Sequence, residues 1–166
     1  SGATFPVGVT NVTYRVTDAA GLTADCSFTV TVNDTQIPTI ACPANQNVSA
    51  NASCQAILAD YTGLATVADN CTASGSITVT QSPLAGSTIS GTTTITLTAD
   101  DGNGNTAQCT FDVIIGDTQN PTITCPANHT VNANASCQAI LADYTSMATV
   151  ADNCTPTGSI VVTQSP

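Results

Sequence analysis

The stretch CPANQNVSANASCQAILADYTGLATVADNC, residues 42–71, recurs almost unchanged as CPANHTVNANASCQAILADYTSMATVADNC, residues 125–154. A shift of 83 residues superposes the two copies, and 40 of the 50 positions from 34 to 83 are identical to their counterparts. Only 10 of the 33 positions from 1 to 33 match in this way. A fixed period is the mark of a repeat array. Because its 166 residues make two periods, we expect the chain to be a segment of a longer polymer.

Cysteines are the residues expected to stabilise a core that is poor in aromatic residues. The chain has no Trp, three Phe and three Tyr, but eight Cys, four in each period. An even number at constant spacing predicts a disulfide framework in an oxidising compartment. Zinc is disfavoured, because no C-x2-C pair occurs and the single His129 aligns with Gln46. We therefore expect a secreted, extracellular or cell-surface protein.

The charge of the chain is negative and sparse. Arg15 is the only basic residue, and eleven Asp give a formal net charge of −10. Nucleic acid and anionic membranes are poor partners for such a surface, whereas divalent cations are good ones. No apolar run approaches the roughly 20 residues that cross a bilayer, so no membrane insertion is expected in this segment. The many Thr, Ser and Asn residues are consistent with a glycoprotein or with simple compositional bias, and the type of glycosylation stays open.

Alternation of apolar and polar residues with period two predicts β-strands along each period. It is clearest over residues 26–32 and 109–115, and it recurs over 76–80 and 94–98. Asp, Gly and Asn at 101–105 predict a hairpin loop between two of these strands. Residues 55–61 tolerate a helix but are too few, so a strand or a short irregular edge is preferred. The pattern predicts an all-β protein of seven-stranded antiparallel sandwiches, of the immunoglobulin or fibronectin type.

Several short motifs follow one another along the chain in a fixed order and spacing. They are Asp34-Thr-x-x-Pro38-x-Ile-x-Cys42-Pro, Ala68-Asp-Asn-Cys71, Gly91-x-Thr93, Thr98-Ala-Asp-Asp-x-x-Gly-Asn105, Cys109-x-Phe-x-Val113 and Thr4-Phe-Pro-Val-Gly-Val-Thr-Asn-Val-Thr-Tyr14. Together they resemble the hyalin repeat (HYR) domain, in a version similar to the one in long secreted bacterial surface proteins. The resemblance covers the whole chain and implies tandem immunoglobulin-like β-sandwiches of extracellular proteins linked to adhesion. An additional cysteine pair and a missing Trp depart from the family pattern.

The resemblance also implies the domain boundaries. A domain runs from the Asp-Thr-x-x-Pro motif to the end of the Cys-x-Phe-x-Val strand, which makes residues 34–116 one complete domain. Residues 1–33 then form the C-terminal part of a preceding domain, and residues 117–166 the N-terminal part of a following one.

The disulfide pairing follows from the same resemblance. The cysteine pair that the family commonly shares corresponds to Cys42 and Cys109, and the parity of the two strands agrees with it. Cys54 and Cys71 are then left for each other, and the same rule gives Cys137–Cys154 in the next period. Two cysteines, Cys26 and Cys125, are expected to have no partner within this fragment.

Two groups of Asp are candidates for Ca²⁺, an ion that takes six to eight oxygen ligands. The first group lies at the domain junctions and comprises Asp34, Asp69, Asp117 and Asp152. The second is the loop Asp101-Gly-Asn103-Gly-Asn105, which has oxygens at alternate residues. The alternative for both is turn chemistry, which favours Asp, Asn and Gly without any ion. Calcium is thus the one cofactor that the sequence suggests.

A structural segment of a long extracellular filament or adhesin stalk is the function that the repeat favours. Neighbouring repeats or copies of the same protein are then the expected partners. The alternatives are a carbohydrate- or protein-binding adhesion module, with glycans or a surface as partner, and an accessory domain of a large secreted enzyme. Catalysis in this segment itself is not expected, because it has no repeated His, no Lys, no Glu and no Gly-x-Ser-x-Gly motif.

Overall fold

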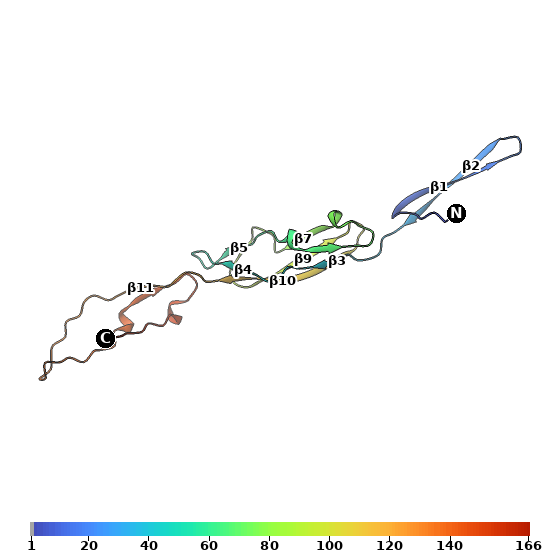
Figure 1. Ribbon diagram of the computed structural model, residues 1–166. Helices are drawn as coiled ribbons and strands as arrows, with labels where there is room; N and C mark the ends of the chain where they lie inside the picture. Colours follow the sequence, from blue (N-terminus) through green and yellow to red (C-terminus); the bar gives the residue numbers. More distant parts are fainter. Residues whose placement is uncertain (1) are drawn as a thin grey trace. The chain divides into compact units, whose positions relative to one another are not determined.

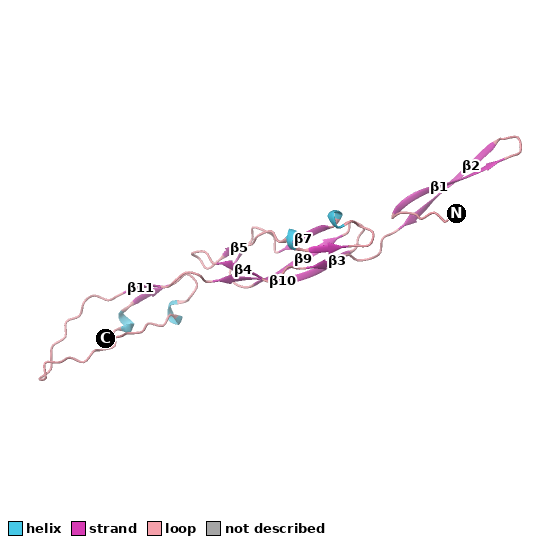
Figure 2. Ribbon diagram, in the orientation of Figure 1, coloured by secondary structure: helices cyan, strands magenta, loops and turns pink. Residues whose placement is uncertain are grey.

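A computed structural model describes residues 2–166, and it confirms the all-β prediction. Its described residues form twelve strands and four single-turn 3-10 helices, with no α-helix among them. Figure 2 shows the helical turns as short cyan pieces between magenta strands. None of the helical segments found in residues 2–166 has the length and apolarity needed to cross a membrane.

The N-terminal segment is a long β-hairpin, drawn in blue in Figure 1. β1 (Gly8–Thr17) pairs antiparallel with β2 (Thr23–Val32) over ten residue pairs, from Gly8↔Val32 to Thr17↔Thr23. Its turn is closed by Asp18, whose Oδ1 accepts hydrogen bonds from the N–H groups of Ala20 and Leu22. Ser1, the first residue of the expected partial domain, lies outside the described residues.

The central segment carries the largest sheet, with strand order β4-β10-β9-β7. β4 pairs parallel with β10, and β7 pairs antiparallel with β9. Two smaller antiparallel pairs, β3 with β6 and β5 with β8, complete this segment. The bounds are β3 Thr39–Ala41, β4 Gln46–Ser49, β5 Ala56–Ile57, β6 Thr66–Ala68, β7 Thr78–Ser82, β8 Thr88–Ile89, β9 Thr93–Asp100 and β10 Thr106–Gly116, with 3-10 turns η1 Thr62–Leu64 and η2 Ser74–Ser76.

These strands lie close to where the sequence pattern predicts them. Residues 101–105 form the loop between β9 and β10, as expected. The strand predicted from residue 76 begins instead at Thr78, because Ser74–Ser76 forms a 3-10 turn. Residues 55–61 contain the two-residue strand β5, which fits the prediction of a short irregular edge.

Among residues 2–166, the buried Ala, Val, Ile, Leu, Phe and Tyr side chains lie within residues 56–113, and Pro38 is fully buried as well. Alternate residues of β9 are fully buried, since Ile95, Leu97 and Ala99 each have 0% exposure. Tyr61 packs edge-on against Phe111, with ring centroids 5.3 Å apart. Ala, Val, Ile and Leu supply most of the buried side chains, as expected for a chain with few aromatic residues. The remaining core residues are Ala56, Leu58, Ile77, Ile89 and Val113.

The C-terminal segment has little regular structure. β11 (Thr122–Thr124) pairs antiparallel with β12 (Thr149–Ala151), and two 3-10 turns follow the pattern of the central segment, η3 (Thr145–Met147) and η4 (Thr157–Ser159). Long loops, pink in Figure 2, connect these elements.

Candidate metal centre and disulfide junction

Three aspartates from separate strand ends come together in the central segment. Asp34 lies two residues after β2, Asp69 follows β6 and Asp101 follows β9. Each offers one carboxylate oxygen to a group in which all such oxygens lie within 4.8 Å of one another. Asp34 and Asp101 are buried, with 8% and 4% exposure. We call Asp34, Asp69 and Asp101 the acidic cluster.

The loop after β9 holds the Asp101 carboxylate in its charged form. Its Oδ1 accepts hydrogen bonds from the N–H groups of Asn103 and Asn105, and its Oδ2 accepts one from the Asn105 side chain at 2.7 Å. Burial by itself would raise the pKa of Asp101, but these hydrogen bonds outweigh it and lower the pKa below its ordinary value. Asp101 therefore remains an anion at neutral pH.

Asp34 is tied to the same loop by two asparagines. The side chain of Asn103 donates to Asp34 Oδ2, and that of Asn105 donates to the Asp34 carbonyl, each at 3.3 Å. The Asn103 side chain also donates to Thr72 Oγ1 at 3.0 Å. The linker that enters the domain is thereby held to the β9–β10 loop.

Asp69 has one oxygen without a hydrogen-bond partner. Its Oδ1 accepts hydrogen bonds from the N–H groups of Cys71 and Thr72, at 2.8 and 2.9 Å. Its Oδ2 is buried and has no partner among the described residues. A buried carboxylate oxygen left unsatisfied is costly unless something else binds it.

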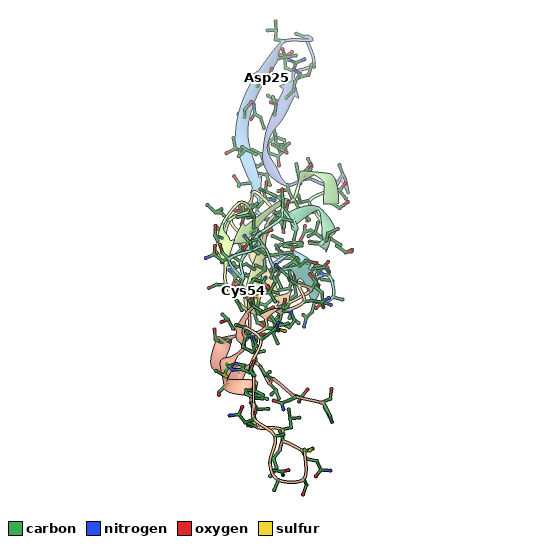
Figure 3. All side chains as sticks on the ribbon, turned by 90° about the vertical axis from the view of Figure 1, so that its left-hand side faces the viewer. Asp25 and Cys54 are labelled. Atoms are coloured by element: carbon green, nitrogen blue, oxygen red, sulfur yellow. A yellow bond between two sulfur atoms is a disulfide. The ribbon has the colours of Figure 1, made fainter. Side chains whose placement is uncertain are left out.

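The charge of the cluster is not balanced by a basic side chain. Arg15, the only basic residue, forms a bidentate ion pair with Asp25 on the hairpin, at 2.7 Å (Asp25 is labelled in Figure 3). Carboxylate, amide and carbonyl oxygens are the ligands that Ca²⁺ prefers. The acidic cluster is therefore suited to a hard divalent cation.

The sequence-predicted acidic residues are distributed differently from the expectation. Asp34 and Asp69 meet as expected of a junction group, but Asp101, which was assigned to a separate loop site, joins them. In the next period Asp117 and Asp152 interact with each other, and no third acidic residue joins them among residues 2–166. The position of Asp101 at the end of a predicted strand was the signal that could have placed it in the cluster.

Two disulfides are present, and they differ in the sequence separation of the cysteines that they join. Cys42 is bonded to Cys109, the pair that the family resemblance implied. Cys54 is bonded to Cys154, at a sequence separation of 100. The loop of Cys54, labelled in Figure 3, also contacts the second cysteine's segment through Asn153, whose side chain donates to the Asn51 carbonyl at 2.9 Å.

The expected bonds Cys54–Cys71 and Cys137–Cys154 are thus corrected. Cys71 and Cys137 are free, as are Cys26 and Cys125, which were expected to be. The error came from pairing the remaining cysteines within one period. The Asn51 loop instead meets the Ala-Asp-Asn-Cys segment of the next period. Desolvation by neighbouring atoms and then the negative charges of the acidic cluster raise the pKa of the free Cys71 thiol, although the residue is exposed.

The comparisons with known proteins point to one family. The HYR domain family matches residues 1–32 and 33–115. A curated protein named Hyalin, from Strongylocentrotus purpuratus, is 37% identical over 135 residues. That match covers 76% of this chain but 11% of the relative, so the chain spans a small part of the relative's length. No solved structure matches the chain significantly.

Proposed function

Since this chain belongs to the HYR domain family, we propose that it is a structural repeat segment of an extracellular surface protein. In this proposal, tandem immunoglobulin-like sandwiches follow one another as a stalk or filament that serves adhesion. The 37% identity over 135 residues to Hyalin, a much longer protein, supports this proposal.

The observation that carries the proposal is the recurrence of structural elements at the sequence period. The strand pair β3–β6 and the turns η1 and η2 return 83 residues later as β11–β12, η3 and η4. Units that share their sequence and local structure are interchangeable along a chain, as a spacer requires. The proposed boundaries remain 1–33, 34–116 and 117–166.

Electron microscopy of the native protein tests this function. Regular fibres or beaded stalks are expected, with a rise of roughly 35 Å for each sandwich if strands of ten residues lie along the axis. Discrete compact particles without repeat would contradict the proposal.

An adhesion module that binds carbohydrate is less well supported. It would need an exposed aromatic platform, and Tyr61 and Tyr144 are the aromatic residues that recur at the sequence period besides Phe28 and Phe111. Tyr61 is 6% exposed and packs against Phe111 in the core. A core role therefore accounts for this tyrosine in the complete repeat.

Calcium binding at the acidic cluster is the second part of the proposal. Three carboxylates without a basic partner, one of them with a buried unsatisfied oxygen, support it. A cation there would join the domain-entry linker at Asp34 to two loops of the domain. It would thereby stiffen the junction with the preceding repeat.

Thermal unfolding in chelator and in millimolar Ca²⁺ tests the site. A ligand at 100 times its Kd stabilises by about 2.7 kcal/mol, so the midpoint should rise by several degrees with Ca²⁺. Asp69→Asn should remove that rise. The control is Asp18→Asn, in the turn of the N-terminal hairpin outside the acidic cluster, which should keep the rise. Equal midpoints with and without Ca²⁺ in the unmodified protein would reject a structural ion.

A further inference from the structure

The Cys54–Cys154 bond connects two different repeats. Its separation of 100 residues exceeds the period of 83, and Cys154 is the counterpart of Cys71 one period later. The bond therefore joins the Asn51 loop of one repeat to the Asp-Asn-Cys loop of the next. By contrast, the Cys42–Cys109 bond, with a separation of 67, lies within one repeat.

We propose that a disulfide equivalent to Cys54–Cys154 forms between every two successive repeats. Cys71 is then the cysteine that bonds to the preceding repeat, and Cys137 is the cysteine that bonds to the following repeat. Cys71 would form a disulfide with the cysteine that corresponds to Cys54 in a preceding repeat. Cys137 would form one with the cysteine that corresponds to Cys154 in a following repeat. This inference rests on the proposed repeat array and specifies how its members are connected.

The free Cys137 loop already has the geometry of the bonded Cys54 loop. In the bonded loop, Asn51 N–H donates to the Gln55 carbonyl at 2.7 Å and Cys54 N–H donates to the Asn51 carbonyl at 3.0 Å. The free loop repeats both bonds at the same distances, between Asn134 and Gln138 and between Cys137 and Asn134.

The side chains and backbone angles of the two loops agree as well. Asn51 Oδ1 accepts from the N–H groups at 53 and 55, and Asn134 Oδ1 accepts from those at 136 and 138. The two cysteines are the only non-glycine residues with positive φ among those described, 54° for Cys54 and 56° for Cys137. An L-residue rarely adopts this conformation. The free loop is therefore built for the same bond.

The Asp-Asn-Cys loop, which supplies the second cysteine of the bond, also makes the same hydrogen bonds in its bonded and free copies. Asp152 Oδ1 accepts from the N–H groups of Cys154 and Thr155, and Asp69 Oδ1 accepts from those of Cys71 and Thr72. Asn153 reinforces the bonded junction through the Asn51 carbonyl. Its counterpart Asn70 is exposed and can make the same contact with a preceding repeat.

Two separations account for all eight cysteines. If the first kind of bond joins cysteines that are 67 residues apart, Cys26 and Cys125 have no partner within residues 1–166. If the second kind joins cysteines that are 100 residues apart, Cys71 and Cys137 have none. These four are the free cysteines of the structure. Each one's partner position falls before residue 1 or after residue 166.

Formation of the bond requires an oxidant, for which a low-molecular-weight disulfide such as oxidised glutathione is sufficient. One cysteine thiolate attacks the oxidant and forms a mixed disulfide, releasing one thiol. The second cysteine thiolate then displaces the other half as a second thiol. The two cysteines lose two protons and two electrons in total, and the S–S bond of the oxidant is reduced to two thiols.

Each junction would then have two covalent connections, the peptide linker and the disulfide. Two attachments restrict rotation of one repeat against the next far more than a single linker does. They also keep successive repeats connected after a single backbone cleavage in the linker. Both properties suit an extracellular stalk.

Peptide mapping of the native protein tests the pairing. Free thiols are alkylated under denaturing, non-reducing conditions, and the chain is cut on the N-terminal side of Asp. Peptide 34–59 should be linked to the peptide that begins at Asp152 and contains Cys154, as well as to peptide 101–111. Cys71, in peptide 69–99, should be protected from alkylation wherever a repeat precedes it. A link between 34–59 and 69–99, or a Cys71 that remains alkylated in such repeats, would overturn the proposal.

The isolated 166-residue chain distinguishes a second copy from a neighbouring repeat as the source of the partner. In a C26S/C125S background, oxidised glutathione should join copies through Cys137 of one and Cys71 of another. The expected result is a ladder of covalent oligomers on a non-reducing gel, which Cys137→Ser abolishes while peptide 34–59 stays linked to 152–166. Bonds between two Cys71 or two Cys137, or no ladder at all, would contradict the pairing rule.

Failure of this inference and failure of the filament function can be told apart. The peptide map reads connectivity whether or not the material forms fibres. Fibres with alkylated junction cysteines would refute the inference alone, whereas linked repeats in compact particles would refute the filament alone.

Discussion

Residues 34–83 and 117–166 share 40 of 50 positions, yet only the first of these two described segments contributes side chains to the hydrophobic core. The first contains β3 to β7, whereas the second retains only counterparts of β3 and β6. The retained strands pair with each other inside the segment. The strands that are lost, β4, β5 and β7, are those whose partners β10, β8 and β9 lie in residues 84–116.

Burial shows the same contrast. Leu58 is 3% exposed and its counterpart Leu141 is 57% exposed. Tyr61 packs on Phe111, whereas Tyr144 stacks on His129 at 5.1 Å. Strand formation at these positions therefore depends on partner strands, because local propensity is the same in both segments.

Removal of the Cys42–Cys109 bond should cause the largest loss in the free energy of unfolding. A disulfide that closes a loop of this length stabilises by about 4 kcal/mol, so C42S/C109S should lower the free energy of unfolding by about that amount. The control C125S, at the counterpart of Cys42, should change little in the isolated 166-residue chain, because Cys125 is free there. Denaturant unfolding measures both, and equal losses would show that Cys125 is also bonded in solution.

Leu58→Ala should have the next largest effect. Truncation of a buried Leu costs about 3 kcal/mol through lost burial and the cavity left behind. In the isolated 166-residue chain, Leu141→Ala, in an identical local sequence, should cost about 0.5 kcal/mol or less because its side chain is exposed. Chemical unfolding of the two variants measures the difference. Similar costs would mean that the C-terminal segment has a packed core of its own.

Gln81→Ala should have an intermediate effect. Its side chain accepts from Tyr61 N–H at 2.7 Å and donates to the carbonyls of Ala59 and Pro83 at 3.1 Å. Because Gln81 is buried, its loss leaves unsatisfied groups and should cost about 2 kcal/mol. Gln164→Ala should cost less, because the corresponding bonds to residues 144 and 142 are exposed to water. The same unfolding assay tests this, and a smaller loss for Gln81→Ala would contradict it.

The hairpin ion pair should have the smallest effect. The Arg15 guanidinium lowers the pKa of the Asp25 carboxyl. Because a lowered pKa stabilises the folded state above the ordinary Asp value of about 4, this small contribution is present at neutral pH and is lost as the pH falls through the folded pKa. Arg15→Gln should raise the Asp25 pKa in an NMR titration. The control Asp60, whose pKa is lowered by Thr62, should not move. An unchanged Asp25 pKa would show that the ion pair does not persist in solution.

Much of the fold could be predicted from the sequence, because period-two alternation and turn residues act locally. The strands β2, β9 and β10 and the loop 101–105 follow from that pattern. The acidic cluster was only half predicted. Asp34 and Asp69 share the repeated junction motifs, but the approach of Asp101 depends on where β9 ends relative to β2 and β6.

The sequence alone determined the repeat, the all-β character and the family, since these rest on residue order and periodicity. The tertiary structure decided which strands form, because backbone hydrogen bonds in a sheet need a partner from elsewhere in the chain. It also decided that Cys54 bonds to the next repeat. Disulfide pairing depends on the distance between two cysteines in space, and that distance is not set by the 16 residues that separate Cys54 from Cys71 in the sequence.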